Sequence, residues 1–367
     1  YSLYGGLSAV AWTDVIQVVF LVLGGLITTY LALDILSDGA GFLVGFNLVL
    51  EGAPEKFHMI LDQSNSQYKN LPGIWVLIGG LWVANLYYWG FNQYIIQRTL
   101  AAKSLEEAQN GIALAAFLKI IIPFIVVLPG IAAFVMVNDP EVMARLGASG
   151  QLNLPGVGAS DKAYPWLLQL LPTGLKGIAF AALTAAVVSS LASMLNSTST
   201  IFTMDIYKQY INRNASDRQL VQTGRLVAGI ALIFACIMAP LLGNIDQAFQ
   251  FIQEYTGIVS PGILAVFLLG LFWKKTTNQA AIWGAISSIP IALGLKFIPG
   301  IPFMNQMGLT AIGTMILIII ISYQKGKGED DPKGIQLNEG LFSTSPIFNI
   351  SAFIICILTS VLYAIFW

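Results

Sequence analysis

The chain has 367 residues, of which 56% are hydrophobic and only 10% are charged, and its formal net charge is −1. A mean hydropathy of +0.74 excludes an ordinary soluble protein and is typical of an integral membrane protein. The net charge excludes a nucleic-acid-binding protein, because no basic surface could neutralise phosphates. The two cysteines lie in separate apolar segments and the single histidine, His58, lies in a polar one. We therefore expect neither a disulfide framework nor a metal enzyme with His and Cys ligands.

About nine segments are apolar over roughly 20 residues, the length that a helix needs to cross about 30 Å of hydrocarbon. Backbone groups in lipid must be satisfied within the segment, so helices are the expected structure. The predicted fold is an all-α integral membrane protein, embedded in a lipid bilayer. The predicted spans are 8–34, 72–98, 108–136, 176–203, 222–242, 249–272, 278–298, 305–323 and 347–367.

The first span carries a carboxylate, Asp14, at membrane depth. A charged side chain there is costly and needs a partner or a polar cavity, which indicates a pathway for a polar or charged solute. The chain enters this span at once, without Met or a basic leader, so we expect it to be a piece of a longer protein.

The connections between the spans predict the orientation. Those after 72–98, 176–203, 249–272 and 305–323 are rich in Lys and Arg, beginning with Arg98 and Lys103. The positive-inside rule places them in the cytoplasm. The two long segments 35–71 and 137–175 then lie outside, and each contains a short amphipathic stretch, Phe42–Leu50 and Pro140–Leu146, expected to form a helix over the outer mouth.

The second span, 72–98, contains the densest polar cluster, with Asn85, Tyr88, Trp89 and Gly90. Aromatic faces suit the C–H face of a pyranose ring, and carboxamides suit its hydroxyls. Gly90 would weaken the helix and free backbone carbonyls, as transporters do near the midplane. The alternative is an aromatic belt at the membrane interface together with hydrogen bonds between helices.

The third span carries Lys119 within the apolar stretch Gly111–Val137. An amine in hydrocarbon costs about 2.5–3.5 kcal/mol on insertion scales. Lys119 is therefore expected to face a polar cavity. The alternative is a buried structural latch in which the amine pairs with a carbonyl or a carboxylate.

The fourth span stacks hydroxyls at helical spacing, among them Ser189, Ser190 and Ser193. Na⁺ is a hard cation, and hydroxyl and carbonyl oxygens suit it better than nitrogen or sulfur. Asp14 could supply the negative charge that such a site needs. The alternative is ordinary packing of small residues between helices.

The sixth span opens with Gln253, which could reach a central solute, and Glu254, which is expected to face water near the helix end. Further along, the segment 324–345 is rich in Lys, Gly, Glu and Asp. This composition predicts a flexible cytoplasmic linker before the final helix.

Several motifs together resemble the sodium/solute symporter family. They are Gly5–Gln17, the pair Ser189-Ser190 leading to Leu195-Asn196-Ser197, and Met204-Asp205-Ile206-Tyr207. The stretch Trp82–Ala102 is similar to the sugar-transporting branch. The resemblance covers essentially the whole chain.

The resemblance implies a LeuT-type bundle of two inverted five-helix repeats with flanking helices. Residues 1–272 would hold the last helix of the first repeat and the whole second repeat, and 273–367 the C-terminal flanking helices. It also implies a secondary active transporter in the plasma membrane, in which Na⁺ and a sugar such as galactose or glucose move together by alternating access.

The resemblance assigns site residues by motif. Ala186, Ser189 and Ser190 would line the Na⁺ site, with Asp14 near it. Sugar contacts would come from Asn85, Trp89, Lys119 and Gln253, and Tyr88 would be the inner gate. The family's broken first core helix and the helix after it complete both sites but are not in these residues, so the full-length protein is expected to be the functional entity.

Three alternatives remain open from the residues. The co-transported solute could be an amino acid, a vitamin or a carboxylate, since Lys119 could pair with a carboxylate. The bundle could instead be a sensor, although no signalling domain is visible. An enzyme is least favoured, because no triad, metal cluster or phosphate loop is visible. The exact sugar and the oligomeric state stay open.

Overall fold

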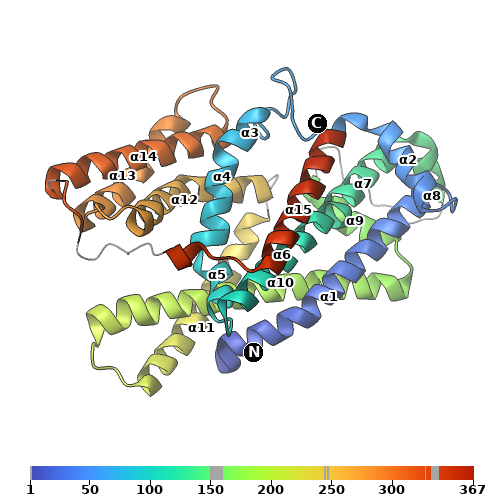
Figure 1. Ribbon diagram of the computed structural model, residues 1–367. Coiled ribbons are helices and arrows are strands. Elements are labelled where there is room, and N and C mark those ends of the chain that lie inside the picture. Colours follow the sequence, from blue (N-terminus) through green and yellow to red (C-terminus); the bar gives the residue numbers. More distant parts are fainter. Residues whose placement is uncertain (1, 149–159, 244, 246–247, 327, 332–338) are drawn as a thin grey trace. The chain divides into compact units, whose positions relative to one another are not determined.

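The computed structural model describes residues 2–148, 160–243, 245, 248–326, 328–331 and 339–367, which are mostly helical and include no strand (Figure 1). This confirms the predicted all-α class. The chain forms two compact units, each made of two separate stretches. Unit 1 comprises Tyr1–Phe57 and Gln97–Gln247, and unit 2 comprises His58–Ile96 and Ala248–Trp367.

The described residues of unit 1 form eight α-helices, which are joined in places by 3₁₀ or π-helical segments. The π-helical segments are η3 (Pro123–Val127) and η5 (Phe202–Ile211), which continue α6 and α10. The α-helices are α1 (Ser2–Leu36), α2 (Phe42–Gly52), α6 (Leu105–Ile122), α7 (Leu128–Asn138), α8 (Pro140–Ala148), α9 (Ala163–Leu170), α10 (Thr173–Ile201) and α11 (Asp217–Leu242).

Unit 2 contains α3 (Ile74–Ile78), α4 (Gly80–Leu86), the π-helical η2 (Tyr87–Phe91), α12 (Ala248–Phe272), α13 (Asn278–Lys296), α14 (Phe303–Gly326) and α15 (Pro346–Ile365). Helix α5 (Gln93–Leu100) begins in unit 2 and ends in unit 1. The predicted span 72–98 is thus not one helix but several short ones.

All nine predicted spans are helical in the described parts of the chain, and seven candidate spans are long and apolar enough to cross a membrane. The two others are 72–98, which is broken, and 278–298, which forms the shorter α13. The predicted amphipathic helices also form, as α2 and α8; their place over an outer mouth stays a prediction.

In unit 1, α1 packs along α10, and glycine allows the close approach. A Cβ at Gly24 would lie only 2.8 Å from the Cβ of Ala182. The far end of α1 belongs to an apolar core that also includes α2, α7, α8 and α9. Its most buried members include Leu33, Met136 and Trp166. This core anchors α1 and so fixes the position of Asp14 near its other end.

In unit 2, α12, α13 and α14 form a tightly packed group to which α4 is added. A Cβ at Gly262 would meet the Ser288 side chain at 2.0 Å, and one at Gly284 would meet Ile318 at 2.4 Å. Val83 of α4 shares a buried cluster with Leu264. The broken second span is therefore held against a rigid helical group.

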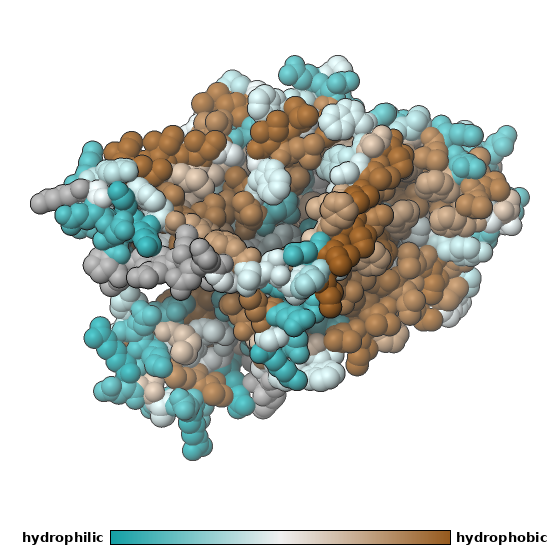
Figure 2. All heavy atoms as spheres, in the orientation of Figure 1, coloured by the Kyte–Doolittle hydropathy of each residue, from teal (hydrophilic) through white to brown (hydrophobic). Residues whose placement is uncertain are grey.

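Apolar side chains cover the outer faces of the helices. Figure 2 shows them along α15, where Phe353 is 67% exposed, and Ile237 of α11 is 65% exposed. Such faces suit lipid rather than water. The predicted linker 324–345 begins later than expected, since α14 continues to Gly326. Residues 327 and 332–338 of that linker lie outside the described part of the chain.

Candidate functional site

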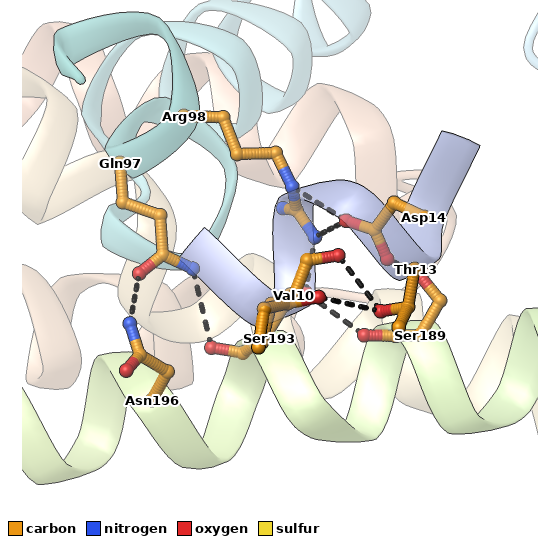
Figure 3. A network of polar contacts seen from close by, with 9 residues as sticks. Val10, Thr13, Asp14, Gln97, Arg98, Ser189, Ser193 and Asn196 are labelled. Carbon is orange, nitrogen blue, oxygen red and sulfur yellow. Dashed lines mark hydrogen bonds and ion pairs between the residues drawn. The ribbon is translucent and has the colours of Figure 1, made fainter. Parts of the chain in front are cut away.

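A polar network in unit 1 centres on Asp14 of α1 (Figure 3). Its Oδ1 accepts a hydrogen bond from Ser189 Oγ of α10 at 2.5 Å. Its Oδ2 accepts from Arg98 Nε of α5 at 2.8 Å and also forms an ion pair with the Arg98 Nη2 group. The Asp14 side chain is only 15% exposed. Charge and hydrogen bonding therefore tie three helices together at one carboxylate.

The network continues along α10. Arg98 Nη2 also donates to Ser193 Oγ, and Ser193 Oγ donates to the Ser189 carbonyl at 2.8 Å. Next to Arg98, Gln97 donates to the Ser193 carbonyl at 3.3 Å and accepts from Asn196 Nδ2 at 2.9 Å. These contacts fix α5 along one face of α10, as Figure 3 shows.

Arg98 has a role that the sequence interpretation did not give it. It lies in α5, near the end of the predicted span 72–98, and balances the charge of Asp14; its place on the cytoplasmic side stays a prediction. The physical reason is the cost of a lone carboxylate in an apolar environment. That cost predicts some partner for Asp14, but the sequence separation of 84 residues hides which cation it is.

The predicted Na⁺ residues share one stretch of α10. Ala186 and Ser189 are partly buried, and Ser190 is exposed. Their spacing of three and four residues puts them on one helix face. Across the described residues, no cluster of three or more His, Cys, Asp or Glu side chains could hold a metal. The oxygen donors offered here are hydroxyls and backbone carbonyls, which a hard cation prefers.

The hydrogen bond made by the Ser189 hydroxyl is compatible with such a donor role. A hydroxyl has one proton and two lone pairs. Because the proton goes to Asp14, the lone pairs remain free to face a cation. Thr13, one residue before Asp14, differs: its hydroxyl donates to the carbonyls of its own helix, at 2.9 Å to Ala9 and 3.0 Å to Val10.

In unit 2, the aromatic cluster lies at the break in the second span. Tyr88 and Trp89 contact edge-to-face with ring centroids 5.1 Å apart, and the Tyr94 hydroxyl donates to the Tyr88 hydroxyl at 2.7 Å. Both rings and Gly90 fall within the π-helical η2, a feature that often marks functional sites. This confirms the expected irregularity at Gly90. Asn85, one turn earlier, donates to its own helix at the Leu81 carbonyl, 2.9 Å away.

The remaining predicted residues are distributed over both units. Gln253 is partly buried on α12 of unit 2. Lys119 is exposed on α6 of unit 1, one turn before Pro123 opens η3. Glu254 corrects the expectation that it simply faces water, because it pairs with Lys296 of α13 at 3.0 Å. His58 is exposed as expected and its Nδ1 lies 2.6 Å from the Trp367 carbonyl oxygen.

Comparison with known proteins identifies relatives. The model of the sodium:solute symporter family matches residues 1–288. A sodium/glucose cotransporter of Vibrio parahaemolyticus is 63% identical over 100% of this chain and 68% of its own length. The human sodium/myo-inositol cotransporter 2 is 34% identical over 80% of this chain, which spans only 45% of that relative.

A solved structure shows the same fold. It is a Na⁺-coupled sialic acid symporter in a substrate-bound outward-open state, 25% identical, with a TM-score of 0.71. The match covers 88% of this chain and 64% of that one. It confirms the predicted LeuT-type helical class. The chain thus spans 68%, 45% and 64% of the lengths of these three relatives, in the order given.

Proposed function

Because the chain belongs to the sodium:solute symporter family, we propose that the full-length protein containing it carries a sugar across the plasma membrane together with Na⁺. It is a multi-pass transporter rather than an enzyme. The observation that carries the proposal is the 63% identity, over every residue, to a sodium/glucose cotransporter. The relative named for myo-inositol supports a polyhydroxylated substrate.

The proposal for Na⁺ rests on α10. Ala186 would offer its carbonyl, and Ser189 and Ser190 their hydroxyl oxygens, as in a hard-cation site. Asp14 would act through Ser189 by taking its proton, while Arg98 holds the carboxylate in place. A membrane potential of 100 mV supplies about 2.3 kcal/mol for each inward positive charge. Na⁺ entry would use this energy to drive the sugar inward.

The proposal for the sugar uses the residues that the family motifs assign. Asn85 and Gln253 would hydrogen-bond hydroxyls, and Trp89 would stack on the apolar face of the ring. Tyr88, which the Tyr94 hydroxyl and the Trp89 ring hold in position, would close the inner side. Lys119 would donate to hydroxyls through up to three N–H groups.

Uptake by the full-length protein in proteoliposomes tests this function. Radiolabelled galactose and glucose should accumulate under an inward Na⁺ gradient and fail to accumulate when K⁺ replaces Na⁺. Sugar accumulation that is independent of Na⁺, or no sugar uptake by correctly folded protein, would contradict the proposal.

One observation favours a second substrate class. The amine of Lys119 suits a carboxylate, and a relative of known structure is named for sialic acid. A carboxylate solute would compete with radiolabelled galactose if this reading holds. Lys119→Ala would then abolish the competition by the carboxylate and reduce galactose uptake less. If the site binds only sugars, Lys119→Ala should instead abolish galactose uptake.

A further inference from the structure

An ion pair in unit 2 lies next to a proposed sugar contact. Glu254 Oε1 and Lys296 Nζ are 3.0 Å apart, with side chains 38% and 35% exposed. The same Lys296 Nζ lies over the Tyr255 ring, 4.6 Å from its centroid. One amine of α13 therefore holds two consecutive residues of α12, and both follow Gln253 directly.

The charge of Lys296 also fits the helix that carries it. Lys296 is the last residue of α13, and Glu254 lies about two turns into α12. A cation is favoured at a helix C-terminus, where the carbonyls carry a partial negative charge. Because α13 follows α12 after a short connection and packs against it, the end of one helix meets the beginning of the other.

The rest of the α12–α13 contact is of a different kind. Towards its other end, α12 approaches α13 through Gly262 against Ser288, and Ala265 is fully buried in a cluster with Ala280. That part is fixed by close packing. Near Gln253 the ion pair performs the same task, beside a small cavity lined also by Gln306 and Met307 of α14.

We infer that Glu254 and Lys296 are positioning residues for Gln253: their ion pair fixes the first turns of α12 on α13 and so orients the Gln253 amide toward the sugar. The inference rests on the proposed function of this chain as a sugar symporter. A preorganised amide binds more tightly because less ordering is needed when the substrate arrives. The pair itself does not contact the sugar.

The test compares single variants of the full-length transporter in proteoliposomes, with rates expressed per folded molecule. Glu254→Gln and Lys296→Met should each raise the sugar KM about fivefold, a typical effect of losing one partly buried interaction, with kcat nearly unchanged. Lys275→Met is the matched control. Lys275 lies just beyond the other end of α12 and also sits over a tyrosine, Tyr323, at 5.7 Å. Its loss should leave the sugar KM unchanged.

A double-mutant cycle separates positioning from general support. In a Gln253→Ala background, Glu254→Gln should raise the KM little further, because the residue through which it acts is gone. An equal rise in both backgrounds, or an unchanged KM in both single variants, overturns the inference. If a single variant does not fold, the double variant Glu254→Gln with Lys296→Met, which leaves no unpaired charge, replaces it. This double variant should show the same fivefold rise in the sugar KM over the wild-type value.

The wild-type measurement distinguishes the two levels of the proposal. Wild-type protein without Na⁺-driven sugar uptake refutes the proposed function, and the positioning role with it. Normal wild-type uptake with variants that miss the expected KM pattern refutes the positioning role alone.

Discussion

The Ser189 hydroxyl donates to Asp14 and is also proposed to bind Na⁺. Its proton goes to Asp14 at 2.5 Å, and its lone pairs remain available to a cation. Ser190, the next residue, is exposed, and its proposed role is limited to binding the cation through its hydroxyl oxygen. At the scale of single residues, the two serines should therefore respond differently to the same substitution.

Ser190→Ala should raise the Na⁺ concentration for half-maximal uptake about fivefold or more, since losing one ligand costs roughly 1–3 kcal/mol. The sugar KM at saturating Na⁺ should stay near the wild-type value. Ser189→Ala should have a larger effect, because it also removes a hydrogen bond from Asp14. Thr184→Ala is the control: its hydroxyl also lies on α10 but donates to the Phe180 carbonyl of its own helix. Unchanged Na⁺ dependence in both serine variants would show that the cation binds elsewhere.

The Asp14–Arg98 pair predicts strong coupling between two substitutions. Asp14→Asn and Arg98→Gln should each lower the free energy of unfolding by about 1–3 kcal/mol, because each leaves one charge unpaired in a mostly apolar setting. The double variant should lose clearly less than the sum. Thermal unfolding in detergent measures the loss of stability in each variant. Lys103→Gln is the control, because it removes an exposed charge in the connection that follows α5. Additive losses would mean that the pair is not formed in the folded protein.

For Asp14, the energetic cost of a lone carboxylate gave a correct prediction, whereas the polar cavity expected at Lys119 stays a prediction. A carboxylate in the first span needed a polar environment, and Asp14 has one. The identity of its partner required the fold, because Arg98 is distant in sequence and basic residues at helix ends are common in any membrane protein. The same holds for Glu254, whose partner Lys296 ends another helix.

Helical elements followed from apolar length, but their interruptions did not. Helices α12, α14 and α15 begin and end within about three residues of their predicted bounds, because hydropathy sets them. The π-helical segment η3 begins at Pro123, which interrupts regular helices, and η5 begins at Phe202, which carries no such signal; neither interruption was predicted. Gly90 was the local signal that the sequence interpretation used, since glycine weakens a helix, and η2 contains it.

Gly90→Ala tests whether the interruption in the second span matters for the solute. Nothing lies within 4 Å of a Cβ built at Gly90, so alanine fits. Alanine favours a regular helix over glycine by about 1 kcal/mol, which should shift Tyr88 and Trp89 and raise the sugar KM without lowering the melting temperature. Gly229→Ala in α11 also meets nothing within 4 Å and is the control. A wild-type KM with the same melting temperature would make η2 a purely structural feature.

For the whole molecule, the sequence predicted the class of fold and the family, and both were confirmed. Long sequence motifs identify the family, and the hydropathy pattern predicts a membrane-embedded helical fold. The division at residue 272 into repeat core and flanking helices stays a prediction. The pairing of distant stretches into two compact units was not predicted, because composition does not change at Phe57 or Ile96.

The interleaving of these units bears on the order in which the chain matures on the ribosome. Unit 1 is complete once synthesis reaches Gln247, but 58–96 belongs to unit 2 and its packing partners start at Ala248. During that interval α4 has been made without the helices that cover Val83, whereas Ala132 of unit 1 already has its neighbours. In stalled nascent chains lacking Cys236, a Val83→Cys thiol should stay reactive to maleimide until α14 has emerged. An Ala132→Cys thiol should be protected earlier. The apolar surface of the helices near residue 80 would thus be covered by the insertion machinery or by lipid while the rest of unit 1 is synthesised.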